Sequence, residues 1–264
     1  MIVNDGIKVA RNSLLKVIDY FFSSFKTLGV VMLLIGLWQV GSESFGEFLL
    51  PTPLAVSQKA IEILTSNQND ILISLYRGSI GIGVAFMLGI GLGLVAGSFK
   101  SFAAFMQPLN TILLSISPII WVVFALFWFS FGNVSTIFTI IITTTPLTFA
   151  SAMIAMQSLK TELKELFDAY KLGFWLKIRY LYLPYLTGYI IGSLSVAFAM
   201  GVKIVVMAEL LGASDGIGAR IADARTMLDT TEVMAYVMLT ITFVMLFEAI
   251  VITPLKIVLM PWKR

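Results

Sequence analysis

The chain has 264 residues, of which 58% are hydrophobic and only 12% are charged, and its mean hydropathy is +0.94. A soluble domain carries about 25% charged residues, so half that share, together with several apolar runs of about 20 residues, indicates a helical protein that crosses the membrane repeatedly. Cysteine and histidine are both absent. Their absence excludes disulfides and the usual zinc sites, and it removes the commonest acid–base catalyst.

Six apolar segments follow one another along the chain, each long enough to cross a membrane as a helix. They lie near residues 22–42, 76–97, 102–130, 134–158, 185–211 and 233–258. Pro118 in the third segment and Pro146 in the fourth predict a kink or a break in those two helices. Residues 1–264 are therefore predicted to form one all-α, polytopic transmembrane domain with six helices.

Basic residues are concentrated on one side of the predicted spans. Thirteen of the 18 lie in residues 1–27, at Lys100, in residues 160–184 or near the C-terminus. Because loops rich in lysine and arginine stay in the cytoplasm, both termini are predicted to be cytoplasmic, and the first span is expected to remain as an anchor. The opposite side carries eight carboxylates: Glu43, Glu47, Glu62, Asp70, Asp215, Asp223, Asp229 and Glu232.

Two local patterns precede and occupy the second span. The prolines of LPTP predict an extended entry to a short interfacial helix over residues 54–64. Gly89, Gly93 and Gly97 have GxxxG spacing, which predicts close packing against another helix. These glycines lack the strand–turn–helix context of a nucleotide site, and the sequence has no GxxxxGK[ST] motif. If ATP drives this protein, another chain must bind it.

The most charged part of the chain is residues 160–184, KTELKELFDAYKLGFWLKIRYLYLP, where eight of the 33 charged residues fall within twenty positions. Its apolar residues recur at helical spacing and form one stripe: Leu163, Leu166, Phe167 and Tyr170. With Thr161 as the N-cap and Gly173 as the stop, this pattern predicts a cytoplasmic helix of about three turns. An ordinary loop helix is the plainer interpretation, but the stripe and the carboxylates favour a protein partner over anionic lipid.

This stretch resembles the EAA loop of the permeases of binding-protein-dependent ABC importers, in which a coupling helix docks into a groove of the ATPase. Leu183-Pro184 matches the LP of that loop. Counting back at the spacing of the nitrate/sulfonate/taurine/bicarbonate subfamily places the glutamate at Glu165 and the glycine position at Lys171, with a glycine two residues later. The resemblance implies that nine consecutive residues contact the ATPase: Glu165, Leu166, Phe167, Asp168, Ala169, Tyr170, Lys171, Leu172 and Gly173.

Three further segments resemble the same subfamily, in the same order along the chain. LPTPLAV (50–56) is similar to its LPSPxxV element, SLYRGSIGIGVAFMLGIGLGLVAG (74–97) to its SLxRxxxGF span, and AELLGASDGIGARIADA (208–224) to its AExLxxxxGLGxxI segment. The resemblance implies the type I ABC importer permease fold in the bacterial inner membrane. It also implies a homodimer of permeases, two ATPases that bind ATP and Mg²⁺, and an external substrate-binding protein or lipoprotein. Such a permease is expected to bind no cofactor, to contact lipid but no nucleic acid, and to catalyse no covalent chemistry.

Two charged residues are candidates for the translocation path or its gate. Lys203 lies in the middle of the fifth span, and Glu209 lies six residues later near its outer end. This separation turns the side chains about 120° apart and about 9 Å along the axis, so no direct ion pair is expected. Lys203 is interpreted either as lining the path, where it favours an anion, or as pairing with another helix, with Glu248 as the partner. Glu209 is interpreted as forming structural or gating hydrogen bonds, and Glu248 as structural.

The third span contributes the last candidates, Pro118 and Trp121 in the run SPIIWVVFALFWF. They lie where family members have a broken helix near the pathway, and plain helix packing is the equal alternative. The resemblance suggests a small anion of the sulfonate, nitrate, taurine or bicarbonate type as substrate, or a vitamin precursor. The competing interpretation is an ion-coupled secondary transporter or channel in which Lys203, Glu209 and Glu248 form a charge relay.

Overall fold

The computed structural model describes residues 13–66, 68–159, 161–171 and 173–259, and over these ranges it contains helices and no strand. The N-terminal half contains α1 (Ser13–Phe45), α2 (Pro53–Ser66), α3 (Gln68–Ser98), α4 (Lys100–Ser115), α5 (Pro118–Phe129) and α6 (Asn133–Gln157). The C-terminal half contains α7 (Thr161–Ala169), α8 (Phe174–Lys177), the π-helical turn η1 (Ile178–Tyr182), α9 (Leu183–Gly212), α10 (Ile217–Thr226), α11 (Thr230–Phe247), the π-helical turn η2 (Glu248–Ile252) and α12 (Thr253–Leu259). Leu172 and the end residues on which the predicted orientation of the termini depends lie outside the described residues.

Four of the predicted spans are confirmed as continuous apolar helical segments. They run over Asn69–Ser98, Asn133–Gln157, Trp175–Gly212 and Thr230–Leu259. The apolar part described in α1, Gly29–Phe45, is shorter than these segments, and α4 with α5 makes a fifth span only if the bent pair is counted as one. The total of six spans therefore stays a prediction.

The predicted third span is broken. α4 and α5 meet at an angle of 92°, and Ile116 and Ser117 between them have extended backbone. Pro118 lacks a backbone N–H and disfavours the helical conformation at the residue before it, so it begins α5 and cannot continue α4. α6, by contrast, continues through Pro146 without interruption.

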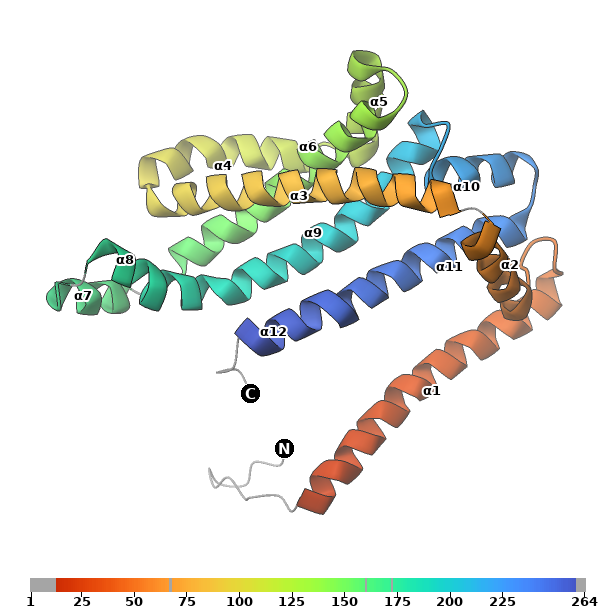
Figure 1. Ribbon diagram of the computed structural model, residues 1–264, viewed down its shortest axis with the longest axis horizontal. Coiled ribbons are helices and arrows are strands. Elements are labelled where there is room, and N and C mark those ends of the chain that lie inside the picture. The colour runs from red at the N-terminus through yellow and green to blue at the C-terminus, as the bar shows by residue number, and fades with distance from the viewer. Residues whose placement is uncertain (1–12, 67, 160, 172, 260–264) are drawn as a thin grey trace.

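The core of the bundle is formed by α3, α6 and α9, which lie side by side (Figure 1). Glycines on one face of α3 let α6 approach closely. A Cβ on Gly93 would lie 2.5 Å from the carbonyl oxygen of Phe149, and one on Gly97 would lie 2.4 Å from Cβ of Met156. Gly91, on another face, has nothing within 4 Å of the same position. The close packing predicted from the GxxxG spacing is confirmed.

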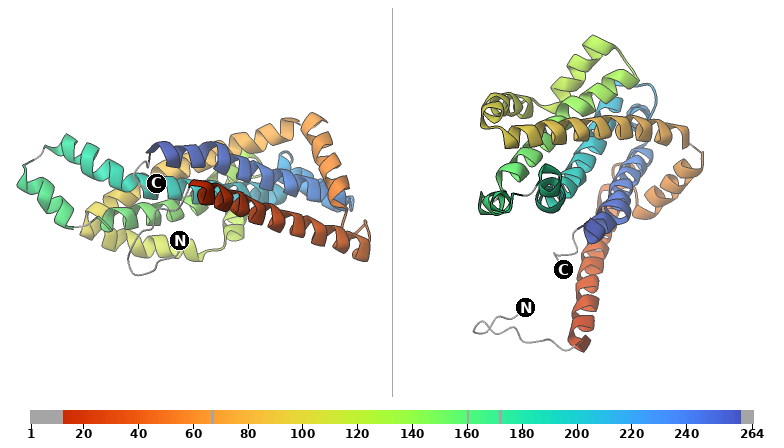
Figure 2. Two further views of the ribbon diagram at one scale, coloured as in Figure 1. Left: turned by 90° about the horizontal axis from the view of Figure 1, so that it is seen from below. Right: turned by 60° about the vertical axis from the view of Figure 1, so that its left-hand side comes forward.

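The two ends of the bundle differ in what they carry. α7 and α8 lie at one end, called here the α7 end, and α10 and α2 lie at the other, called the α10 end (Figure 1). α2 confirms the short helix predicted over 54–64, and its Val56 and Ala60 pack with Tyr236 of α11 in a buried cluster. α1 joins this end through the bond from Trp38 Nε1 to the Pro51 carbonyl (3.0 Å) and then extends away from the core (Figure 2).

Candidate functional site

The segment predicted to couple to an ATPase protrudes at the α7 end (Figure 1). α7 and α8 form a short hairpin, and an ion pair between Asp168 and Lys177 holds the two helices together. Large apolar side chains are exposed on both: Leu166 is 50% exposed and Trp175 is 79% exposed. From Trp175 the helical path continues through η1 into α9 without a gap. A displacement of this hairpin would therefore be carried directly into the span that contains Lys203.

The end of α7 corrects one sequence prediction. Gly173 was expected to stop the helix, but α7 ends at Ala169, and the N–H of Lys171 then bonds to the Asp168 carbonyl at 2.9 Å. Lys171 has a φ of +50°, whereas Gly173 has no such left-handed φ. A left-handed conformation costs a residue with a Cβ roughly 1–2 kcal/mol. The glycine position that spacing assigns to Lys171 is thus also the position where the backbone favours glycine.

Pro118 and Trp121 lie in the first turns of α5. The Trp121 ring meets Phe124 edge-on at 6.2 Å, and Phe124 stacks on Trp128 at 5.6 Å, so an aromatic row runs along the helix. Trp121 Nε1 is buried and has no hydrogen-bond partner among the described residues. Trp121 thus lies in a packed aromatic row of the broken span, and its role in a path stays a prediction.

Lys203 is exposed on α9, although its neighbours Val202 and Ile204 are buried. Within the described part of the chain no carboxylate lies within ion-pair distance of it. The suggested pair with Glu248 is not formed, because Glu248 is bound by Lys256 Nζ at 2.9 Å and by the Ser195 hydroxyl. Lys203 therefore remains an unpaired cation on an open face of α9.

Arg77 of α3 is the centre of a buried network at the α10 end. Its side chain is 1% exposed. Nη1 contacts Oε1 of Glu209 at 3.0 Å and the carbonyl of Asp215 at 2.9 Å, and Nη2 contacts Oδ1 of Asp215 at 2.5 Å. Nε donates to Oδ1 of Asn133 at 2.7 Å. One guanidinium thus joins α3, the start of α6, the end of α9 and the loop that leads to α10.

Glu209 is fully buried and has hydrogen bonds on both carboxylate oxygens. Besides Arg77, it accepts from the Ser74 hydroxyl at 2.7 Å and from the Gly218 N–H at 3.1 Å. A buried carboxylate is costly unless it is paired and hydrogen-bonded, and all three donors meet that need. Through these contacts Glu209 holds α3, the end of α9 and the start of α10 together, which is a structural role. A role for Glu209 in gating remains a proposal.

A second carboxylate secures the loop between α9 and α10. Asp70 accepts from the Gly216 N–H at 2.9 Å, and its other oxygen lies 3.1 Å from Nε of Arg220. Gly216 has a φ of +97°, and a Cβ there would lie 2.6 Å from the carboxyl carbon of Glu209. Only glycine combines that backbone conformation with so close an approach.

Sequence reasoning did not predict this network. Arg77 was recognised as part of the SLYRG segment at the edge of a span, and Asp215 as one of the outer carboxylates, without a contact between them. The partners of Arg77 lie 132 and 138 residues further along the chain, and Asn133 lies 56 residues further. The available signal was an arginine at the edge of an apolar span, which predicts that a partner exists without saying which one.

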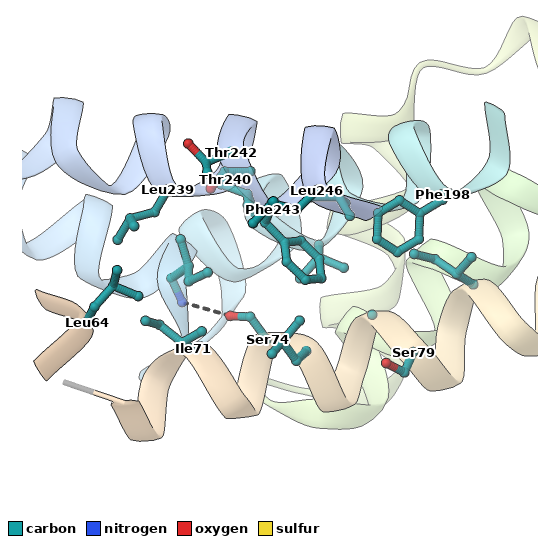
Figure 3. Close-up of a pocket in the computed structure, with 17 residues that line it drawn as sticks. Leu64, Ile71, Ser74, Ser79, Phe198, Leu239, Thr240, Thr242, Phe243 and Leu246 are labelled. Carbon is teal, nitrogen blue, oxygen red and sulfur yellow. Dashed lines mark hydrogen bonds between the residues drawn. The ribbon is translucent and has the colours of Figure 1, made fainter. Parts of the chain in front are cut away.

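A cavity of about 210 Å³ lies between α3, α9 and α11 (Figure 3). Its walls are mainly apolar, with Leu64, Phe198, Leu239, Phe243 and Leu246 among the lining residues. Ser74 lies on its wall, where the hydroxyl accepts from the N–H of Ile217 at 2.8 Å. None of the four predicted path residues lines this cavity, and the path itself stays a prediction.

Comparison with known proteins decides the family. Residues 89–260 match the family described as binding-protein-dependent transport system inner membrane component. The chain belongs to this family. It is therefore a membrane subunit of an ABC transporter, as the four ordered motifs predicted.

Two relatives extend the family match toward the N-terminus. The chain is 26% identical over 234 residues to a protein described as an aliphatic sulfonates transport permease, SsuC of Bacillus subtilis (strain 168). The match covers 84% of this chain and 85% of SsuC. It is 28% identical over 202 residues to the nitrate import permease protein NrtB of Synechococcus elongatus, covering 72% of each chain.

A solved structure supports the fold. The MetNI methionine ABC transporter, in inward facing conformations, contains a chain that matches with a TM-score of 0.61, covering 74% of this chain and 98% of that chain. The two are 16% identical, so the likeness shows the fold alone. The predicted type I ABC importer permease fold is confirmed at this level.

Proposed function

We propose that this family member is the permease of an ATP-driven importer for a small anion. The importer would combine two copies of this chain, two ATPases that bind ATP and Mg²⁺, and an external substrate-binding protein or lipoprotein, with both permease termini in the cytoplasm. The relatives named for aliphatic sulfonates and nitrate support an anion of that type as the substrate.

Lys203 is the observation that carries the substrate class. It lies within the continuous helical segment Trp175–Gly212, is exposed, and has no acidic partner among the described residues. An unpaired ammonium facing lipid is expensive, so such a residue is expected to face a protein interior or a water-filled cavity. In a path between two copies of the chain it would attract anions and repel cations.

The exposed α7–α8 hairpin is the proposed contact with the ATPase. The Asp168–Lys177 ion pair makes the hairpin one unit, and the helix continues from Trp175 into α9. Closure of the ATPase dimer would push this unit and tilt α9 relative to its neighbours. The path would then open alternately to the two sides of the membrane.

Transport by the complete importer tests this proposal. The ATPase would be identified by its GxxxxGK[ST] motif among proteins that co-purify with the tagged chain, and both would be reconstituted in liposomes with the binding protein. We expect ATP-dependent uptake of labelled nitrate or an alkyl sulfonate. Lys203→Met should reduce uptake by about tenfold or more, since a charge contact at an effective dielectric constant near 20 is worth a few kcal/mol. Lys203→Arg, which keeps the charge, is the matched control.

Two results would contradict the anion assignment. One is unchanged anion uptake by the Lys203→Met variant. The other is uptake of an uncharged vitamin precursor that neither nitrate nor sulfonates inhibit.

The ion-coupled alternative has no structural support, because Glu209 pairs with Arg77, Glu248 pairs with Lys256, and Lys203 pairs with neither acid.

A further inference from the structure

Lys171 has a backbone conformation that favours glycine. Its φ is +50°, and it lies directly after the turn that ends α7. Helices commonly end at such a left-handed residue, and glycine is preferred there because it has no Cβ. Spacing from Leu183-Pro184 assigns the glycine of the EAA loop to Lys171. This chain therefore retains the conformation of that glycine while placing a long cationic side chain on it.

Gly173 does not take over this conformational role. Its φ lies outside the left-handed region, and a Cβ built on it would meet nothing within 4 Å. An alanine would fit there without a clash. The presence of a glycine two residues after the expected position therefore does not relieve the strain at Lys171.

Among the described residues, no contact of its side chain compensates for the strain at Lys171. Lys171 is exposed, and the described residues provide its side chain with neither a hydrogen bond nor an ion pair. The nearby carboxylate of Asp168 is already bound by Lys177. The ammonium of Lys171 is thus free to meet a partner at the end of α7, next in sequence to Tyr170, which is 73% exposed.

We infer that Lys171 is a specificity-determining residue for the partner ATPase, in which its ammonium pairs with a carboxylate at the rim of the groove that receives α7. The inference rests on the proposed coupling function. Backbone strain that no internal contact offsets is typical of functional positions. Charge pairs at the rim of an interface select the partner and increase the association rate more than they add affinity. An ATPase that lacks this carboxylate would bind the chain more weakly.

A purely structural role makes a different prediction. A cation at the C-terminus of α7 is favoured by the helix dipole and can bond to the last carbonyls. In that case Lys171→Gly, which relieves the backbone strain, would preserve binding of the ATPase. If the ammonium contacts the ATPase, Lys171→Gly should lose binding as much as Lys171→Gln does.

Binding of the cognate ATPase to the chain in nanodiscs distinguishes these roles. For Lys171→Gln and Lys171→Gly we expect a Kd about two- to fivefold higher than wild type at low salt, mainly through slower association, with the difference shrinking at about 0.5 M salt. Lys171→Arg should restore binding, and Gly173→Ala is the matched control that should leave it unchanged. A zero-length carbodiimide cross-link should join Lys171 to an aspartate or glutamate of the ATPase, and the Arg variant should lose the cross-link while it keeps binding.

The possible outcomes separate the two proposals. If wild-type chain binds the ATPase and both uncharged variants bind equally well, the assignment of Lys171 is wrong and the coupling function stands. If the wild-type chain does not bind the ATPase at all, the coupling function is wrong, and the assignment of Lys171 is wrong with it.

Discussion

Arg77 contacts two carboxylates and one amide while it is 1% exposed, so its removal leaves two acids without their cation. The cost of such a change is mainly the uncompensated charge of Glu209, which is fully buried. Breaking a buried pair by removing one partner is far more damaging than replacing both partners together. Single residues of this network are therefore expected to be strongly interdependent.

We expect Arg77→Met to lower the free energy of unfolding by about 3–5 kcal/mol, seen as a clear fall in the apparent Tm of the chain in nanodiscs. Arg225→Gln is the control, because Arg225 is exposed and makes no ion pair among the described residues. Adding Glu209→Gln to Arg77→Met should recover part of the loss. Equal melting temperatures for wild type and Arg77→Met would show that the network does not stabilise the fold.

At the scale of elements, the contact between α3 and α6 depends on the glycines that lie on the α6-facing side of α3, and not on the other glycines of that helix. Gly93 faces the backbone of α6, whereas Gly91, two residues away on the same helix, faces open space. A side chain added on the packed face must push the helices apart, and one added on the open face need not. The same substitution at the two positions therefore separates packing from helix propensity.

Gly93→Val should destabilise the chain by about 1–3 kcal/mol, the usual cost of overpacking, because its Cβ would lie 2.5 Å from the Phe149 carbonyl oxygen. Gly91→Val introduces the same residue into the same helix and should change the apparent Tm little. Comparable losses from both substitutions would contradict the packing explanation.

The helices and their breaks could be predicted where residues close together in the sequence determine them. Hydropathy located four continuous spans, GxxxG spacing located the packed face of α3, and Pro118 located the break between α4 and α5. Gly173 was expected to stop α7 because glycine is the usual residue there, but the helix ends at Ala169 and the left-handed residue after it is Lys171. The partners of Arg77 could not be predicted, because one sequence holds no information on which distant acid it meets.

At the scale of the whole molecule, α1 is the least integrated part. In Figure 1 and in the right-hand view of Figure 2 it extends away from the α3, α6 and α9 core, and side chains such as Met32 are about 62% exposed. Exposed apolar surface of this extent must be covered by lipid or by another chain.

At the scale of the assembly, we expect ATP hydrolysis by the partner ATPase to be the only energy source for uptake. The chain reconstituted without an ATPase should neither hydrolyse ATP nor accumulate nitrate or a sulfonate when a proton or sodium gradient is imposed. Uptake should appear when the ATPase and ATP are added on the side of α7 and the binding protein on the opposite side. Gradient-driven uptake by the chain alone would instead support the ion-coupled transporter.

The sequence separation within the Arg77 network has a consequence for biosynthesis. Glu209 follows Arg77 by 132 residues, so at about 5–20 residues per second the arginine emerges from the ribosome on the order of ten seconds before its acid. During that interval α3 must enter the membrane with an unneutralised guanidinium at its edge. A nascent chain truncated before Glu209 should therefore hold α3 in the bilayer less firmly than the full chain does, because its guanidinium still lacks the buried acid.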